Sequence, residues 1–313
     1  MIYPIDPVMK KVPMTNETPI EYHDLVESLA GELPSIPLIM NDLLKIITDS
    51  NAALFAIRDV IKNDKAIFSK ILKFANNVEY RQGSAERITS ISDAIQRLGL
   101  ENVKKIALNT SVFKLFEELE GSSDFKLEDL WMHSCGVAIA SEALAERFES
   151  KFSDHAYSCG LLHDLGKVAK IKFSLKRFLR EIRHTSRYNC SLDTTEKKLN
   201  TIGHDKLGAL IIKKWSISPV IECTTRWHHT LNKEKRLELE DPNLHKLTDI
   251  IILANHIIKE LNFGNSGCSI KFQLDSDFLR RRKIDGQEFE KCKEVVLDAL
   301  DAEAEHLALF SKE

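Results

Sequence analysis

The stretch "YSCGLLHDLGKVAKI", residues 157–171, decides the fold that this sequence predicts. Its first part, residues 157–162, is apolar or small all round a helix, which is typical of a helix buried on every side. His163 and Asp164 follow directly, and Lys167 comes one helical turn after the histidine. Imidazole and carboxylate groups at the end of a buried helix are typical metal ligands. The stretch therefore predicts a helical core that encloses polar chemistry.

The rest of the 313-residue chain also has helical periodicity, and no segment alternates as a half-buried strand would. The segments "LFAIRDVIKND" (54–64) and "AIFSKILKFANNV" (66–78) each place their apolar residues on one helical face. Ser90 with Asp93 predicts an N-terminal cap, and Gly99 predicts the end of the helix that follows it. The predicted fold class is all-α, with one helical subdomain packed on another.

Four parts are expected along the chain. Residues 1–30 are predicted to form an irregular arm, because four of the eight prolines lie within the first twenty residues. Residues 31–120 form a helical N-terminal subdomain, and residues 121–265 form a second helical subdomain. The segment "EGSSDF", in which Gly and Ser cluster, marks the boundary between them. Residues 266–313 form a helical extension.

The composition is that of a soluble globular protein, with 43% hydrophobic and 29% charged residues. A net charge of −3 gives no general attraction to nucleic acid or to an anionic membrane, so neither partner is expected. No apolar run is long enough to span a bilayer, and the first residues lack the pattern of a secretory signal. Six scattered cysteines without a CxxC pattern favour reduced thiols. The expected location is the cytoplasm.

The histidines form a second pattern. His133 shares a helical face with apolar neighbours and is expected to point inward. His204 opens one predicted helix, and His228 and His229 lie near the end of another. Imidazoles delivered with Asp164 by separate helices are how a helical bundle builds a metal site in its core. From spacing alone, a lone inward histidine such as His133 is more often a hydrogen-bonded core residue than a ligand, and a histidine at a helix end can simply favour the dipole. Spacing alone therefore does not favour the metal site over these interpretations, and they stay open.

Seven motifs occur in the order of a known family: "LPSIP", "VIKNDKAIFSKILKFANN", "ITSISDAIQRLGLENVKKIAL", "LWMHS", "CGLLHDLGKV", "HDKLGALIIKKW" and "RWHH". Together with the histidine order they resemble the HD superfamily of metal-dependent phosphohydrolases, and within it the HD-GYP phosphodiesterases. The stretch from about Leu33 to His229 resembles an HDOD domain in particular. The resemblance implies a helical N-terminal subdomain packed on an HD-like helical subdomain. It also implies a role in bacterial signal transduction, usually regulatory and often without catalysis.

Carried over residue by residue, the resemblance implies one set of metal ligands: His133, His163, Asp164, His204, His228 and His229, with Asn255 at a seventh position. Asp164 and Lys167 would be the catalytic residues if the chain is active, because in relatives this lysine can approach a substrate phosphate. Two departures matter. Active relatives have an aspartate where this chain has Asn255, and the segment after His229 lacks the Glu and the Gly-Tyr-Pro motif of the cyclic-dinucleotide enzymes.

Charge limits what this ligand set can hold. Asp164 is the one clear anion, so two divalent ions would leave about +3 of buried charge, whereas one ion leaves about +1. A nitrogen-rich set favours a transition metal over magnesium. The sequence therefore predicts at most a single divalent ion of Zn, Fe, Mn, Ni or Co.

Three functions remain open from the sequence. The favoured one is a non-enzymatic regulatory module with a degenerate HD metal site and a signalling protein as partner. The first alternative is a mononuclear metal-dependent phosphohydrolase or phosphodiesterase that acts on a nucleotide. The second is a module that binds a nucleotide second messenger or another phosphate ligand in the former active cleft. The basic helix "SLKRFLREIRH" (174–184) is expected to be a solvated face.

Overall fold

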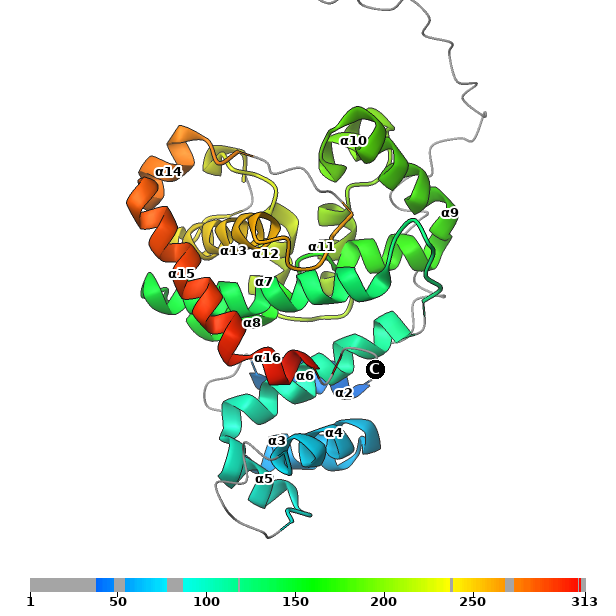
Figure 1. Cartoon of the computed structure of the whole chain (residues 1–313), viewed down its shortest axis with the longest axis vertical. Helices are drawn as coiled ribbons and strands as arrows, with labels where there is room; N and C mark the ends of the chain where they lie inside the picture. Colours follow the sequence, from blue (N-terminus) through cyan, green and yellow to red (C-terminus); the bar gives the residue numbers. More distant parts are fainter. Residues whose placement is uncertain are drawn as a thin grey trace, which may run out of the picture.

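The computed structural model describes residues 38–47, 54–77, 87–117, 119–236, 239–267, 273–308 and 310. Within these ranges the regular elements are helices, and the pairing of Ser122 with Phe125 is an isolated bridge. The predicted all-α class is confirmed (Figure 1). The arm expected at residues 1–30 lies outside the described residues. None of the described helices has the length and apolar character that crossing a bilayer requires.

The first group of helices occupies one end of the molecule (Figure 1). Its members are α2 (Leu38–Ile47), α3 (Leu54–Lys62), α4 (Lys65–Ala75), α5 (Ile91–Leu98) and α6 (Leu100–Glu117). Asp64 caps α4 by accepting from the backbone N–H groups of the second and third helical residues. The predicted cap at Ser90 is confirmed, since its hydroxyl accepts from Asp93 N. Gly99, with φ of +81°, ends α5 as predicted.

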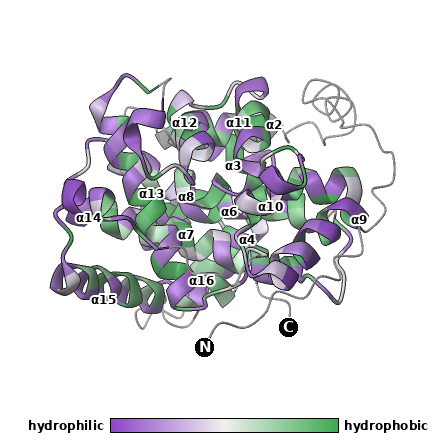
Figure 2. Cartoon of the chain, turned by 90° about the horizontal axis from the view of Figure 1, so that it is seen from above, coloured by the Kyte–Doolittle hydropathy of each residue, from purple (hydrophilic) through white to green (hydrophobic). Residues whose placement is uncertain are grey.

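The second group of helices carries the candidate site. It comprises α7 (Leu127–Arg147), α8 (Ser153–Leu162), α9 (Leu165–Tyr188), α10 (Leu192–Lys198), α11 (His204–Lys214), α12 (Pro219–Trp227), the short 3-10 helix η2 (Lys233–Lys235) and α13 (Pro242–Glu260). Apolar residues gather on α7, α8 and α13 at the centre of the molecule (Figure 2). The basic stretch forms the second half of α9, beyond a kink at Ser174, and Lys176 and Arg180 are exposed as expected.

The C-terminal helices connect the two groups. They are α14 (Ser276–Arg282), α15 (Gly286–Ala302) and α16 (Ala304–Ala308). α15 runs along α7, and α16 reaches α6 (Figure 1). Lys105 of α6 donates to Glu142 of α7 at 2.6 Å and to Glu303 before α16 at 3.4 Å. One half-buried lysine therefore ties the N-terminal helices to both neighbours.

Candidate metal centre

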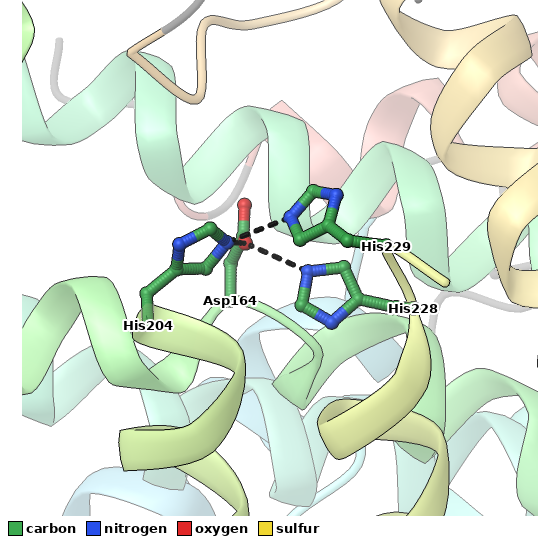
Figure 3. Close-up of side chains that lie close together, drawn as sticks. All are labelled: Asp164, His204, His228 and His229. Carbon is green, nitrogen blue, oxygen red and sulfur yellow. Dashed lines mark hydrogen bonds and ion pairs between the residues drawn. The ribbon is translucent and has the colours of Figure 1, made fainter. Parts of the chain in front are cut away.

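The ends of several helices bring the predicted ligands together. His163 and Asp164 lie between α8 and α9, His204 is the first residue of α11, and His228 and His229 follow α12. Figure 3 shows three imidazoles that approach the Asp164 carboxylate from two helix ends. The ligand atoms form two groups, and within each group all of them lie within 4.8 Å of one another. Group one comprises Asp164, His204, His228 and His229, and group two comprises His133, His163 and Asp164.

Glycine at position 166 is what lets α9 and α11 approach this closely. A Cβ atom on Gly166 would overlap the carbonyl oxygen of His204, and it would also contact the backbone of Gly208 at 2.9 Å. The contact of backbone with backbone places the start of α11 directly against Gly166, two residues after the His-Asp pair. The "HDLGK" sequence therefore encodes a close helix crossing as well as two ligands.

Asp164 joins the two groups, because each of its oxygens faces one of them. Oδ1 lies 3.4 Å from Nε2 of His204 and 3.6 Å from Nε2 of His228. Oδ2 lies 3.3 Å from Nε2 of His163 and 3.8 Å from Nε2 of His133. In group one, Nε2 of His204 and Nε2 of His229 are 2.8 Å apart, so the two rings aim their nitrogens at a common point (Figure 3).

Hydrogen bonds at Nδ1 fix which nitrogen of three histidines is free to bind. Nδ1 of His163 donates to the Gly160 carbonyl at 2.6 Å, and Nδ1 of His228 donates to the Thr225 carbonyl at 2.7 Å. Carbonyl oxygens only accept, so these Nδ1 atoms carry the protons. His204 likewise donates from Nδ1 to a carboxylate. In all three rings the lone pair is therefore on Nε2, which faces Asp164.

The protonation states also suit a metal site. Burial lowers the pKa of His133 and of His229 well below the ordinary value, and it lowers the pKa of His228 to about 4. Burial alone would raise the pKa of Asp164, but His163 and Lys167 outweigh it and hold that pKa well below its usual range. Neutral imidazoles beside an ionised carboxylate are the forms that bind a metal ion.

Buried polar atoms without partners give a further test of fit. Among the described residues, Nε2 of His133, His163 and His228 and Oδ1 of Asp164 are buried and make no hydrogen bond. An unpartnered buried polar atom costs about 1–3 kcal/mol. Asp164 Oδ1 and His228 Nε2 belong to group one, and the Nε2 atoms of His133 and His163 belong to group two. Imidazole nitrogens and a carboxylate oxygen with free lone pairs are donors that a divalent transition metal accepts. The ligand set therefore fits the group that the sequence predicts.

Lys167 lies inside the protein beside Asp164, and its catalytic role stays a prediction. Its Nζ donates to Asp164 Oδ2 at 2.7 Å and to the Ser266 carbonyl at 2.9 Å, and the side chain is buried. The ammonium group is thus on the same Asp164 oxygen that His133 and His163 approach. A cation of this chain already neutralises the carboxylate on the side of group two.

The segment after α13 covers this lysine. Asn265 N donates to the Asp129 carbonyl of α7 at 2.8 Å, and the carbonyl of Ser266 accepts from Lys167. Gly264, with φ of +68°, passes so close to α7 that a Cβ atom there would overlap the backbone nitrogen of His133. Residues 262–267 therefore close the protein over group two.

Asn255 lies in the middle of α13 and is fully buried. Both atoms of its amide are buried without a hydrogen-bond partner among the described residues. A neutral amide oxygen is a weaker ligand than the aspartate of active relatives. Its assignment as a metal ligand stays a prediction.

A buried carboxylate that the sequence analysis did not identify stands behind His204. Glu196 of α10 accepts from Nδ1 of His204 at 2.9 Å and from its backbone N–H at 3.1 Å. Lys170 of α9 bridges Glu196, at 2.6 Å, and Glu181, at 2.7 Å. Glu196 belongs to a polar stretch without apolar periodicity, so its one sequence signal is its position a short distance before His204. It orients the ring and makes it more basic.

A family model of the HDOD domain matches residues 33–231. This chain belongs to the HDOD family. The match contains every ligand position discussed above except Asn255, which lies beyond it. An uncharacterised protein of Treponema pallidum (strain Nichols) is 25% identical over 225 residues, which is 70% of this HDOD chain and 42% of the relative. The chain thus spans less than half the length of the curated relative that it matches.

Solved structures share the HDOD fold. The HDOD domain protein of Geobacter sulfurreducens superposes with a TM-score of 0.69 at 22% identity, covering 90% of this chain and 94% of that one. A candidate signal transduction protein of Marinobacter aquaeolei VT8 has a TM-score of 0.71 at 17% identity, covering 95% and 62%. A candidate phosphohydrolase of Shewanella amazonensis SB2B has a TM-score of 0.66 at 19% identity, covering 92% and 98%.

Proposed function

We propose that this chain is a signal-transduction module that binds a single divalent transition-metal ion in group one and acts on a protein partner without hydrolysing a phosphate ester. The observation that carries the proposal is the pair of hydrogen bonds that the Lys167 ammonium donates, one to Asp164 Oδ2 and one to the Ser266 carbonyl. Lys167 is thereby occupied on the side where a second metal ion or a substrate phosphate would have to lie.

Charge supports one ion and opposes two. One divalent ion beside Asp164 and Lys167 leaves a net charge of about +2, and the Glu196–Lys170–Glu181 network behind His204 offsets about one unit of it. A second ion in group two would add two further positive charges next to the buried ammonium group. Two-metal hydrolysis depends on a symmetric clamp of the attacking and leaving oxygens. Group two is poorly suited to complete such a clamp.

The residues of group one would hold the ion, which when bound would supply Lewis acidity and a binding position for an anion. Glu196 fixes the tautomer of His204, and the Gly160 and Thr225 carbonyls fix those of His163 and His228. Burial shields Asp164, His204 and His228 from water, whereas His229 is half-buried. This arrangement favours tight, structural binding that sets the relative positions of α8, α9, α11 and α12.

A phosphodiesterase assay tests the proposal. The metal-loaded chain would be incubated with bis(p-nitrophenyl) phosphate, cyclic mononucleotides and cyclic dinucleotides, beside a His204→Ala variant. We expect product formation no faster than with the free metal ion. Turnover that disappears in the His204→Ala variant would refute the non-enzymatic assignment.

One observation favours a second candidate, a mononuclear phosphohydrolase. His229 is half-buried, whereas the other three members of group one are buried, so group one is least enclosed at His229. A phosphate ester would have to approach the ion from that side. The same assay separates the candidates, because the hydrolase requires turnover that a His229→Ala variant loses.

A further inference from the structure

A cleft of about 400 Å³ lies among η2, the first turns of α13 and the end of α14. Four cationic and three anionic side chains line it. None of its lining residues belongs to either metal-ligating group. A volume of this size suits a small organic ligand.

The acids of the cleft are neutralised to different degrees. Asp249 is buried and accepts from Arg236 at 2.7 Å and from Arg281 at 2.9 and 3.0 Å. Two guanidinium groups therefore share one carboxylate, which leaves an excess of positive charge at the base of the cleft. Nζ of Lys233 lies 3.8 Å from Oε1 of Glu234, and both side chains are largely exposed.

Arg282 has no counter-charge of its own. Its Nε is buried and makes no hydrogen bond, and within the described ranges no carboxylate lies within ion-pair distance of it. It packs instead on the Phe148 ring, 4.6 Å from the centroid. Burial lowers the pKa of Arg282, and Asp249 offsets only part of that effect. The terminal nitrogens of Arg282 make no hydrogen bond to the described residues, so they can donate to a ligand in the cleft.

His245 also lines the cleft. Its Nε2 donates to the Leu239 carbonyl at 3.0 Å, while its Nδ1 is buried out of reach of solvent. The ring therefore shapes the wall of the cleft and is not one of the groups that would contact a ligand. The guanidinium and ammonium donors of the cleft complement the oxyanions of a phosphate group.

We propose that this cleft binds a small phosphate-bearing molecule, held by Arg282, Lys246 and Arg281. Arginine suits this role because its planar fork matches two phosphate oxygens. The cleft also adjoins the metal centre through the backbone. Arg236 Nε donates to the Thr230 carbonyl at 2.9 Å, and Arg281 donates to the Leu231 carbonyl at 2.9 Å. These carbonyls directly follow His229.

The test is calorimetric titration of the chelator-treated full chain with inorganic pyrophosphate at constant ionic strength. We expect saturable binding with one pyrophosphate per chain. Arg282→Gln and Lys246→Gln should each raise the dissociation constant for pyrophosphate about tenfold, which is the effect of losing one charge-assisted hydrogen bond. Glu240→Gln removes an acid that lines the cleft and should strengthen binding.

Two controls separate this site from other sources of binding. Lys213→Gln removes an exposed lysine of α11 outside the cleft and should bind as the wild type does. His204→Ala, which disrupts the metal centre, should also retain pyrophosphate binding, so the cleft and the metal proposal can fail separately. If the wild-type chain shows no saturable binding at pyrophosphate concentrations up to about 10 mM, the proposal is overturned. Unchanged affinity in both Arg282→Gln and Lys246→Gln overturns it as well.

Discussion

Replacement of Glu196 by glutamine isolates the charge that stands behind the metal centre. The carboxylate accepts from Nδ1 and the backbone N–H of His204 and from Lys170 Nζ, at 2.6–3.1 Å. Glutamine has nearly the same shape and keeps one acceptor oxygen, but it carries no charge. The variant therefore removes the electrostatic part of the interaction with little change in packing.

The size of the effect follows from the pKa of Glu196. Burial would raise that pKa, but His204 and Lys170 outweigh it and lower the pKa from 4.5 to about 2. Each unit corresponds to about 1.4 kcal/mol, so ionised Glu196 contributes about 3 kcal/mol to stability. Because the folded-state pKa is the lower one, the contribution is complete above pH 4.5 and is lost as the pH falls towards 2. Glutamine resembles the neutral carboxyl, so Glu196→Gln should cost about 3 kcal/mol at pH 7.

Glu181 provides a matched control within the same network. It also pairs with Lys170, at 2.7 Å, but burial outweighs the lysine and raises the pKa of Glu181. Ionisation of Glu181 is therefore a net cost to the fold, and Glu181→Gln should change the free energy of unfolding by less than about 1 kcal/mol. Urea denaturation of the metal-free chain, followed by circular dichroism, measures both variants.

Metal affinity gives a second assay for the same variant. Loss of a carboxylate that orients a ligating histidine weakens metal binding by about 10–100-fold. Glu196→Gln should show this loss in a competition titration with a chromogenic chelator, and Glu181→Gln should not. Equal stability losses in the two variants, or wild-type stability in Glu196→Gln, would refute the assignment of Glu196 as the charge that supports His204.

Three further predictions concern the helices around the site. Gly166→Ala should destabilise the fold because its Cβ would overlap the His204 carbonyl, although alanine normally favours a helix over glycine by about 1 kcal/mol. Gly286→Ala places its Cβ in open space and should not destabilise the fold. Thermal melts compare the two variants. Asp249→Ala should cost about 3–5 kcal/mol in urea denaturation because it leaves buried Arg236 unpaired, and a loss below about 1 kcal/mol would show that the pair is not structural. Burial lowers the pKa of His228 from 6.5 to about 4, so the unfolded chain binds more protons in that window. Protonation of His228 should therefore remove up to about 3 kcal/mol of the stability of the metal-free chain as the pH drops from 6.5 to 4, beside the losses from His133 and His229. His228→Gln should make this decline less steep, and an unchanged decline would contradict the assignment.

The sequence predicted those parts of the site that depend on local patterns and family motifs. Ser90 and Gly99 set helix ends through their own backbone and side-chain chemistry, and the structure confirms both. The ligand histidines stand out because polar residues interrupt otherwise apolar helices. His133 was ambiguous from its spacing, and the structure places it within 3.8 Å of Asp164.

The remaining parts depend on contacts that no local pattern encodes. The partner of Lys167 is the carbonyl of Ser266, and a carbonyl is present at every residue, so the sequence carries no sign of it. Glu196 looks like a surface acid in a polar segment until α10 folds back on α9 and buries it. Asp249 and Arg236 are likewise paired only in three dimensions.

The proposed function requires one metal ion per chain, in group one and not in group two. Metal content of the tag-free chain can be measured by inductively coupled plasma mass spectrometry after incubation with Zn, Mn, Fe, Co and Ni. We expect about one ion per chain in the wild type, none in His204→Ala, and about one in His133→Ala, because His133 belongs only to group two. No bound metal, two ions per chain, or loss of the ion in His133→Ala would contradict the proposed function.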